Sequence, residues 1–250
     1  MGKVYIVGIG PGSREYLLPL AEKTIRDADV LIGARRLLSM SGLHLGLSAF
    51  SVIFPPSPAK EKSKIKAGTK KKSFRGVKAG KKIMFFNGNY SKVLDYILRN
   101  KDKEKIVVLV SGDPGIFSFA QQITERLVPC EYEVIPGISS IQLAFARIGK
   151  SWQDAFIFSV HGRPKRGLAK AVLKHKKVFL FTDEKNNPAN IASFLFRKGI
   201  RDREIFVFKN LSFPDEEIIS TDIENLRKSE GKWGRLCVMI VDAQEEHYTV

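Results

Sequence analysis

The sequence predicts an α/β protein made of two α/β domains, and three observations lead to this fold class. Apolar runs that suit buried strands alternate along the chain with helical patterns, which is the order of elements in a parallel α/β sheet. A second series of such runs follows the first. With 250 residues and 44% hydrophobic content, the chain can bury one large core or two modest ones.

The first series begins with a strand at residues 4–7. A helix follows, in which Leu17, Leu18, Ala21 and Ile25 recur at helical spacing. The other elements expected in this half are strands at 29–33, 83–86, 106–110 and 132–136 and helices at 93–99 and 117–127.

The second series contains strands expected at 155–160, 177–181, 205–208 and 236–241 and a helix at 188–197. An amphipathic run at 139–148 precedes it and ends at Gly149. We place the boundary there, which predicts domains at 1–149 and 150–250.

The charge of the chain is unevenly distributed. The net charge is +16, and residues 60–82 contain ten Lys and one Arg against one Glu. The segment is poor in large apolar residues and rich in Pro, Gly, Ser and Lys, which predicts a mobile basic insertion at about 59–82. A solvated loop is the simpler interpretation, and a tract that binds RNA or an acidic ligand is the alternative.

Composition also limits the cellular setting. Cys130 and Cys237 are too few and too far apart for a disulfide framework or a metal cluster, which suits a reducing compartment. The N-terminus lacks the order of a signal peptide, and no stretch of about 18 apolar residues is present. We therefore expect a cytoplasmic protein without a metal site.

The sequence GIGPGS follows the first strand and predicts a glycine-rich turn. A dinucleotide loop would have a third glycine where Ser13 stands, and a phosphate loop would end in Gly-Lys-Ser/Thr. Pro11 also has no backbone N–H to offer a phosphate. Gly8, Gly10 and Gly12 therefore form either a simple tight turn or a site for another ligand.

A second turn, SGDP, follows the strand at 106–110. Asp113 is expected at the N-cap of the next helix and Pro114 at its first position, which would explain both residues structurally. Alternatively, Ser111, Gly112 and Asp113 contact a ligand, because they leave the carboxyl end of a strand, beside the first turn if the strands are neighbours.

A third turn repeats this design with Pro136 and Gly137 ahead of Ser139 and Ser140, either of which could be only a helix cap. Three strand ends that bring Gly, Pro and small polar residues to one edge would form a cleft with few ionisable groups. Such a cleft suits a cofactor held by backbone groups and by shape.

In order and spacing, the three turns resemble those of the tetrapyrrole (corrin/porphyrin) methylase superfamily, whose members use S-adenosylmethionine. Later segments resemble the branch that methylates carbon 5 of cobalt-precorrin-7, the carbon-5 domain of precorrin-6Y methylase. These segments are GARRLL (33–38), FSVHGRP (158–164), LFTDEKNNP (180–188) and KNLSFPDEEI (209–218). The similarity covers nearly the whole chain except the basic segment, and Ser13 replaces an acid found in many relatives.

The resemblance implies two α/β domains with S-adenosylmethionine in the cleft between them, a homodimer, and a role in cobalamin biosynthesis. The residues that it places against the cofactor are Pro11, Ser111, Gly112, Asp113, Ile116, Ser139, Ser140, Thr182 and Leu211. The GIGPG turn would line the floor of the cleft, so Gly10, Gly12 and Ser13 are expected near the substrate.

Peripheral carboxylates of a tetrapyrrole would be met by cations, and Arg35, Arg36 and Arg163 follow predicted strands. His161, in the FSVHGRP segment, is expected on the substrate side as well. His161 and Glu216 are candidates for a general base, but no His-carboxylate spacing identifies one. The three arginines could equally be helix-end or surface residues, and for His161 and Glu216 a structural role is the more common one.

Two other function classes stay open. Relatives with the same fold methylate ribosomal RNA or a modified histidine of a translation factor, and the basic segment would suit RNA. A ligand-binding protein without catalysis could carry the same turns. The chain has no room for a second methyltransferase domain, so a separate carbon-15 methyltransferase and decarboxylase is expected as a partner. The sequence decides neither whether the ring carries cobalt nor which carbon is attacked.

Overall fold

The computed structural model describes residues 2–40, 50–54, 81–86, 88–231, 233–234 and 236–243. The chain forms two compact units, Met1–Ser139 and Ser140–Val250, and each is built on one sheet. The predicted α/β class is therefore confirmed. Within the described ranges, no helix has both the length and the apolar character needed to cross a membrane.

Unit 1 contains a six-stranded sheet in the order β3-β4-β2-β5-β1-β6, and every pairing in it is parallel. Its elements are β1 (Lys3–Gly8), the 3-10 helix η1 (Arg14–Tyr16), α1 (Pro19–Arg26), β2 (Val30–Gly33), α2 (Arg35–Met40), β3 (Phe50–Phe54), β4 (Lys81–Phe85), α3 (Tyr90–Asn100), β5 (Lys105–Val110), α4 (Ala120–Thr124) and β6 (Tyr132–Ile135). The parallel sheet expected for this half is confirmed, and β3 is an additional strand.

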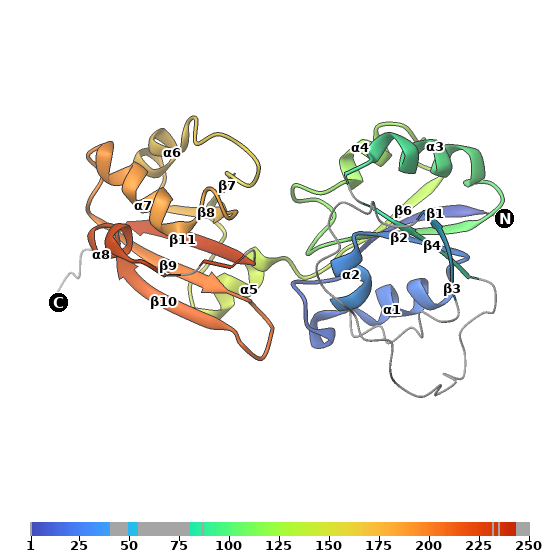
Figure 1. The fold of residues 1–250 in the computed structure, drawn as a ribbon, viewed down its shortest axis with the longest axis horizontal. Coiled ribbons are helices and arrows are strands. Elements are labelled where there is room, and N and C mark those ends of the chain that lie inside the picture. Colours follow the sequence, from blue (N-terminus) through green and yellow to red (C-terminus); the bar gives the residue numbers. More distant parts are fainter. Residues whose placement is uncertain are drawn as a thin grey trace. The chain divides into compact units, whose positions relative to one another are not determined.

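Helices cover both faces of this sheet (Figure 1). On the central strand β5, Val108 packs with α3 and α4 on one face, whereas Val107 and Leu109 pack with α1 and α2 on the other. Alternate side chains of a strand point to opposite faces, so a strand buried on both sides is a continuous apolar run. This is why the run IVVLV identifies β5 from sequence.

Unit 2 contains a five-stranded sheet in the order β10-β9-β11-β8-β7. Its elements are α5 (Ser140–Arg147), β7 (Phe156–Ser159), α6 (Leu168–Lys174), β8 (Lys177–Phe181), α7 (Pro188–Arg197), β9 (Arg203–Lys209), β10 (Glu217–Asp222), α8 (Ile223–Lys228) and β11 (Cys237–Ala243). Among these described strands, β7 and β8 pair in parallel, and the other pairings are antiparallel. The sheet is therefore mixed.

The two units divide between Ser139 and Ser140, within the helical run that the sequence assigned to the first domain. The side chains of α5 explain the difference. The ring of Phe145 lies 6.4 Å from that of Phe179 in β8, and Arg147 is hydrogen-bonded to Glu216. Helix α5 thus packs within unit 2, on the face of β8 opposite to Val178 and Leu180.

The C-terminal boundary predicted for the basic insertion at 59–82 is wrong. Lys81 and Lys82 begin β4, and Lys81 is only 1% exposed. Its Nζ donates to the carbonyl oxygens of Ile25, at 3.3 Å, and of Arg26. A cation at the carbonyl end of a helix is favourable, so Lys81 stabilises the end of α1. Residues 59–80 lie outside the described residues.

Candidate functional site

The three turns leave neighbouring strands of unit 1. Strand β1 pairs in parallel with β5 on one side and with β6 on the other. The condition set on the sequence, that these strands be neighbours, is thus met. Parallel strands bring their carboxyl ends to one edge, so all three turns emerge where open α/β sheets bind ligands.

The first and second turns are hydrogen-bonded to each other. The N–H of Gly10 donates to the carbonyl oxygen of Gly112 at 3.3 Å, and the N–H of Gly112 donates to that of Gly10 at 2.9 Å. Both residues have left-handed φ angles, 78° for Gly10 and 65° for Gly112. Residues other than glycine rarely adopt such φ angles, so the pairing of the two turns explains why both positions are occupied by glycine.

Gly8 and Gly137 are required by close packing. A Cβ atom at Gly137 would lie 2.3 Å from the carbonyl oxygen of Gly112, and one at Gly8 would lie 2.6 Å from the same oxygen. Neither distance is possible for real atoms. The three turns therefore form one compact backbone unit in which these glycines have a structural function.

The carboxylate of Asp113 fixes this arrangement. Its Oδ1 accepts a hydrogen bond from the N–H of Gly115 at 2.8 Å, and its Oδ2 accepts one from the N–H of Gly137 at 3.1 Å. The predicted N-cap role of Asp113 is wrong, and so is the helical position of Pro114. Helix α4 begins only at Ala120, because Phe117 has a left-handed φ of 45° that interrupts the expected helix.

A pocket of about 150 Å³ opens at the carboxyl ends of β2 and β5 in unit 1. It is lined by Ile32, Gly33, Ala34, Leu37, Phe86, Val108, Leu109, Val110, Ser111, Phe117, Ser118 and Phe119. None of these residues is charged. The Ser118 hydroxyl donates to the carbonyl oxygen of Pro114, and Ser111 is exposed. The pocket suits an apolar group more than a charged one.

Helix α2 lies beside the SGDP turn, because its first turn and Ser111 line the same pocket. The predicted substrate cations Arg35 and Arg36 are on this helix, and both are exposed. The guanidinium carbon of Arg35 lies 5.8 Å from the centre of the Phe85 ring. The structure therefore brings Arg35 and Arg36 into the neighbourhood of the turns.

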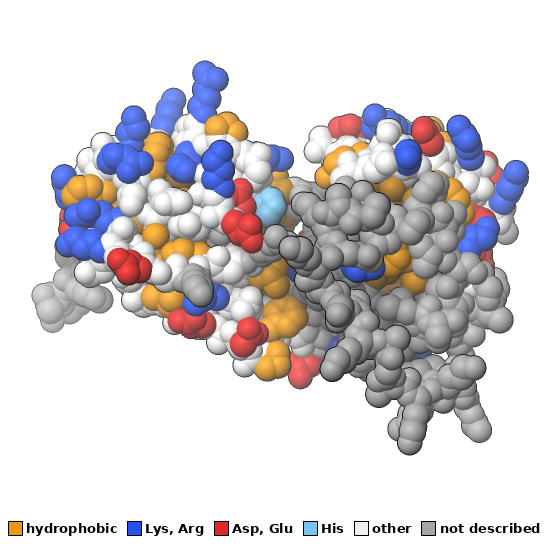
Figure 2. Space-filling model, viewed as in Figure 1, with side chains coloured by type: hydrophobic (Ala, Val, Ile, Leu, Met, Phe, Trp, Pro, Cys, Tyr) orange, Lys and Arg blue, Asp and Glu red, His pale blue; other side chains and the backbone are white. Residues whose placement is uncertain are grey.

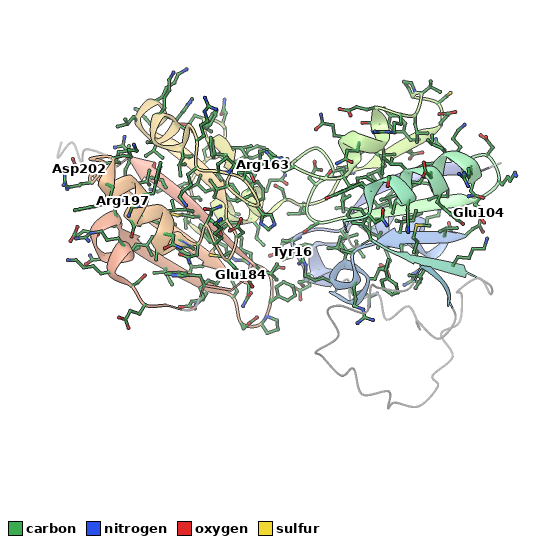
Figure 3. The ribbon with its side chains drawn as sticks, turned by 45° about the horizontal axis from the view of Figure 1, so that its top comes forward. Tyr16, Glu104, Arg163, Glu184, Arg197 and Asp202 are labelled. Carbon is green, nitrogen blue, oxygen red and sulfur yellow. The ribbon has the colours of Figure 1, made fainter. Side chains whose placement is uncertain are left out.

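The remaining predicted residues of this edge are placed as follows. Pro11 and Ile116 are partly exposed, and Gly12 and Ser139 are buried. The Ser13 hydroxyl accepts a hydrogen bond from the N–H of Glu15 at 3.3 Å and so caps η1, which is labelled at Tyr16 in Figure 3. Ser140 is the first residue of α5.

In unit 2, Thr182 and Leu211 are both buried. The Thr182 hydroxyl donates to the carbonyl oxygen of Cys237 at 2.7 Å, which fixes the end of β8 against β11. Leu211 lies between Asn210 and Ser212, whose φ angles are 50° and 73°. Two left-handed residues that flank one buried residue, neither of them glycine, mark a strained loop, and such loops are typical of functional sites.

Glu216 holds this loop in place. Its carboxylate accepts hydrogen bonds from Nε of Arg147 at 2.5 Å and from the N–H of Ser212 at 2.6 Å. Burial alone would raise the pKa of Glu216, but the hydrogen bonds from Arg147 and Ser212 outweigh it and keep the pKa below its usual value. Glu216 is thus a stable anion, and this argues against the role of general base considered from the sequence.

His161 and Arg163 lie in the loop that follows β7. Nδ1 of His161 is 2.8 Å from the carbonyl oxygen of Thr182, and the N–H of Gly162 donates to Asp183 at 2.6 Å. Arg163 is exposed and is labelled in Figure 3, as is Glu184 in the loop that follows β8. Sequence reasoning missed Asp183 and Asn186, although both lie in the segment LFTDEKNNP that carried the resemblance.

Comparisons with known proteins agree with this geometry. Residues 3–227 match the family described as Tetrapyrrole (Corrin/Porphyrin) Methylases. A probable cobalt-precorrin-7 C(5)-methyltransferase of Methanocaldococcus jannaschii is 31% identical over 97% of this chain and 99% of its own length. The cobalt-precorrin-7 C(5)-methyltransferase of Salmonella typhimurium is 27% identical over 85% of this chain and 87% of its own.

Solved structures share the fold. Uroporphyrin-III C-methyl transferase from Thermus thermophilus, complexed with S-adenyl homocysteine, superposes with a TM-score of 0.68 at 18% identity, covering 96% of this chain and 97% of that one. At this level of identity the likeness concerns the fold alone. Because the family match spans most of both units, the chain belongs to the tetrapyrrole (corrin/porphyrin) methylases.

Proposed function

We propose that this protein transfers the methyl group of S-adenosylmethionine to carbon 5 of a cobalt-precorrin or precorrin intermediate in cobalamin biosynthesis. The observation that carries the proposal is the similarity to the Methanocaldococcus jannaschii protein, which extends over 97% of this chain and 99% of that relative. A match over both entire chains supports a shared reaction more strongly than a match to one domain does.

The residues of unit 1 fit S-adenosylmethionine. Bound there, the cofactor would supply a methyl group activated by a positively charged sulfonium. Among the described residues, those that line the pocket beside Ser111 are uncharged and mostly apolar, which suits the uncharged, partly apolar portions of the ligand. Around it, the paired turns offer exposed backbone and hydroxyl groups at fixed positions. These are the features expected of a site that recognises its ligand by shape.

In this proposal, the cofactor is held in unit 1 by Pro11, Ser111, Gly112, Asp113, Ile116 and Ser139 and in unit 2 by Ser140, Thr182 and Leu211. Asp113 acts through its backbone, because its carboxylate is already bound to Gly115 and Gly137. Thr182 offers the cofactor only its oxygen lone pairs, because its hydroxyl hydrogen is donated to Cys237. The turns act mainly by alignment, which is the largest contribution that a protein can make to an in-line methyl transfer.

The substrate is proposed to lie against Gly10, Gly12 and Ser13 and to be bound through its carboxylates by Arg35, Arg36 and Arg163. Guanidinium groups can bind carboxylates through two parallel hydrogen bonds. Arg35 and Arg36 support this role because they are exposed on the helix that lines the pocket. His161 is also proposed on the substrate side.

The proposal is tested by incubating the protein with S-adenosylmethionine labelled in its methyl group and with a panel of precorrins, with and without cobalt. Mass analysis and NMR of the product then identify the methylated carbon. We expect transfer to carbon 5 of cobalt-precorrin-7 or precorrin-7. Transfer to another carbon would show that the proposed position of methylation is wrong. Transfer to RNA or to a protein histidine would favour the alternative substrates of this fold.

Three further properties belong to the same proposal. We propose a homodimer, which light scattering can test, and a separate enzyme for methylation and decarboxylation at carbon 15. A cytoplasmic location is supported by the two free cysteines, of which Cys130 is exposed. Binding of S-adenosylhomocysteine without any methyl transfer would instead indicate a ligand-binding protein.

A further inference from the structure

The hydrogen bond of His161 determines which of its ring nitrogens carries the proton. Nδ1 lies 2.8 Å from the backbone carbonyl oxygen of Thr182. A carbonyl oxygen can only accept, so Nδ1 must be the donor and must carry the hydrogen. In the neutral imidazole, Nε2 then has a lone pair and no hydrogen. Among the described residues, Nε2 has no hydrogen-bond partner, and the side chain is exposed.

The loop that carries His161 is held rigidly to the loop after β8. The N–H of Gly162 donates to Asp183 at 2.6 Å, and Nδ2 of Asn186 donates to the carbonyl oxygens of Val160 at 2.8 Å and Arg163 at 3.0 Å. Both loops leave the carboxyl ends of β7 and β8, which are paired in parallel. Such an edge is where α/β sheets place reactive side chains.

Asp183 gives His161 an anionic neighbour. Burial opposes ionisation of this carboxyl, but hydrogen bonds from the N–H groups of Asn186, Gly162 and Lys185, together with the charge of His161, keep the pKa of Asp183 below its usual value. Asp183 therefore stays ionised and would stabilise an imidazolium. The other charged groups on the two loops are Arg163, Lys165, Arg166, Glu184 and Lys185, and Figure 2 shows further Lys and Arg side chains over the neighbouring helix α6.

Two carboxylates could compete with His161 as the proton acceptor, those of Glu216 and Asp183, and both are poor acceptors. Glu216 is bound by Arg147 and by the N–H of Ser212. Asp183 is bound by the N–H groups of Gly162 and Asn186. Each is stabilised as an anion that already accepts hydrogen bonds, so each has little tendency to take a proton. Nε2 of His161, in contrast, carries a lone pair that is exposed and held in a fixed orientation.

We infer that His161 is the proton acceptor of the methyl transfer, with Nε2 as the accepting atom. This inference rests on the proposed function. In the step, the electron pair of the ring carbon forms the new bond to the methyl carbon, and the carbon–sulfur bond breaks with its electron pair left on sulfur. The hydrogen of the methylated carbon then passes as a proton to Nε2, and its bonding electrons return to the ring. The imidazolium that forms is stabilised by Asp183 and later releases its proton to water.

The test compares two histidine substitutions. In His161→Asn, the amide nitrogen takes the place of Nδ1 and can still donate to Thr182, but nothing replaces Nε2. His175→Asn is the matched control, because His175 lies in the same unit and stacks on Phe156 with ring centres 4.3 Å apart. We expect His161→Asn to lower kcat by about 100-fold or more, within the range for general-base catalysis, and His175→Asn to leave kcat unchanged.

Three further measurements separate a proton acceptor from a structural residue. The wild-type rate should depend on pH in a way that the remaining rate of His161→Asn does not. Nitrogen NMR should show the hydrogen on Nδ1 of His161 in the resting protein. Calorimetry with S-adenosylhomocysteine should give unchanged affinity in His161→Asn.

A wild-type kcat in His161→Asn, or a hydrogen on Nε2 in the neutral protein, would overturn the inference. Loss of S-adenosylhomocysteine affinity together with activity would overturn it too, since His161 would then have a structural role. If the wild-type protein itself fails to methylate any precorrin, the proposed function fails, whereas the NMR measurement still reports on the state of His161.

Discussion

Asp113 joins two of the glycine-rich turns through one carboxylate. Its Oδ2 accepts a hydrogen bond from the N–H of Gly137 at 3.1 Å, while its Oδ1 accepts one from Gly115 at 2.8 Å. Both partners are backbone groups, and Gly112, next to Asp113, is paired with Gly10 of the first turn. The position of all three turns thus depends on this side chain.

We expect Asp113→Ala to destabilise the fold by about 1–3 kcal/mol, because it leaves the N–H of Gly137 without its acceptor. The affinity for S-adenosylhomocysteine should fall as well. Asp113→Asn keeps one carbonyl acceptor, so its stability and its affinity should lie between those of the wild type and Asp113→Ala. Thermal melts with and without S-adenosylhomocysteine measure both effects, and an unchanged melt of Asp113→Ala would show that the turns are held in another way.

Substitution of Gly112 tests the same region less cleanly. The sequence suggests that Gly112→Val would block a ligand and leave the fold intact. Its φ of 65° shows that any side chain there strains the backbone. We therefore expect Gly112→Val to lower the melting temperature as well as the cofactor affinity. A full retention of the wild-type melt would contradict this expectation.

The hydrogen bonds of Glu216 predict a pH dependence of stability. Burial raises its pKa, but Arg147 and the N–H of Ser212 lower it more, so the folded protein has a pKa below the ordinary value of 4.5. A depressed pKa stabilises the fold above the unfolded pKa, and this stability is lost as pH falls through the folded value. Glu216→Gln should therefore be less stable than the wild type near neutral pH, by about 1–2 kcal/mol.

This difference should shrink below about pH 4.5, where the wild-type carboxyl also becomes protonated. Urea unfolding of both proteins at pH 7 and pH 3.5 provides the measurement. Glu224→Gln serves as a control. Hydrogen bonds from Arg227 and Lys228 lower the pKa of Glu224 to about 2, but these ion pairs lie at the surface within one helix and are screened by solvent, so this substitution should change stability little at either pH. A pH-independent difference between wild type and Glu216→Gln would mean that the ion pair with Arg147 contributes nothing.

The two cysteines should react very differently with thiol reagents. Burial raises the pKa of Cys237 to about 12, although Thr182 and Lys209 oppose the shift. The thiolate is the reactive form, so Cys237 should be inert in the native protein. Cys130 is exposed and should react readily. We expect one thiol per chain to be modified in the native protein and two after denaturation. In Cys130→Ser, no thiol should react before denaturation.

The sequence could predict the elements that are buried on both faces but missed those that depend on distant partners. Val107 and Leu109 belong to an uninterrupted apolar run, which identifies β5 without further information. Strand β10 contains Ser220, Thr221 and Asp222, and among the described strands it pairs only with the antiparallel β9. Its sequence, EIISTD, has no long apolar run, so its existence depends on a neighbour that sequence patterns do not identify.

The site shows the same limit. The three turns were recognisable from their Gly and Pro residues, because tight backbone geometry restricts composition. The role of Asp113 was not, because its partner Gly137 lies 24 positions away in sequence. The helix expected after Pro114 was wrong for a local reason, since the left-handed φ of Phe117 is a conformation that propensity does not foresee.

Lys81 provides the last prediction, because it separates the basic segment from the core. Its Nζ binds the carbonyl oxygens of Ile25 and Arg26, and the side chain is 1% exposed. We expect Lys81→Met, which keeps the apolar stem, to destabilise the protein by about 1–3 kcal/mol, because the helix carbonyls lose a charged donor. Lys82→Met is the control: Lys82 is paired with Glu104, and its side chain is 45% exposed.

Two deletions then test the expectation that the segment before Lys81 is an insertion. Joining Ala59 to Lys81 keeps β4 complete, so this variant should melt like the wild type and bind S-adenosylhomocysteine normally. Joining Ala59 to Ile83 removes the first two residues of β4 and with them Lys81, so this variant should lose at least the stability lost in Lys81→Met. If the first deletion is also destabilised, residues 60–80 contribute to the packing of unit 1, and the insertion hypothesis fails.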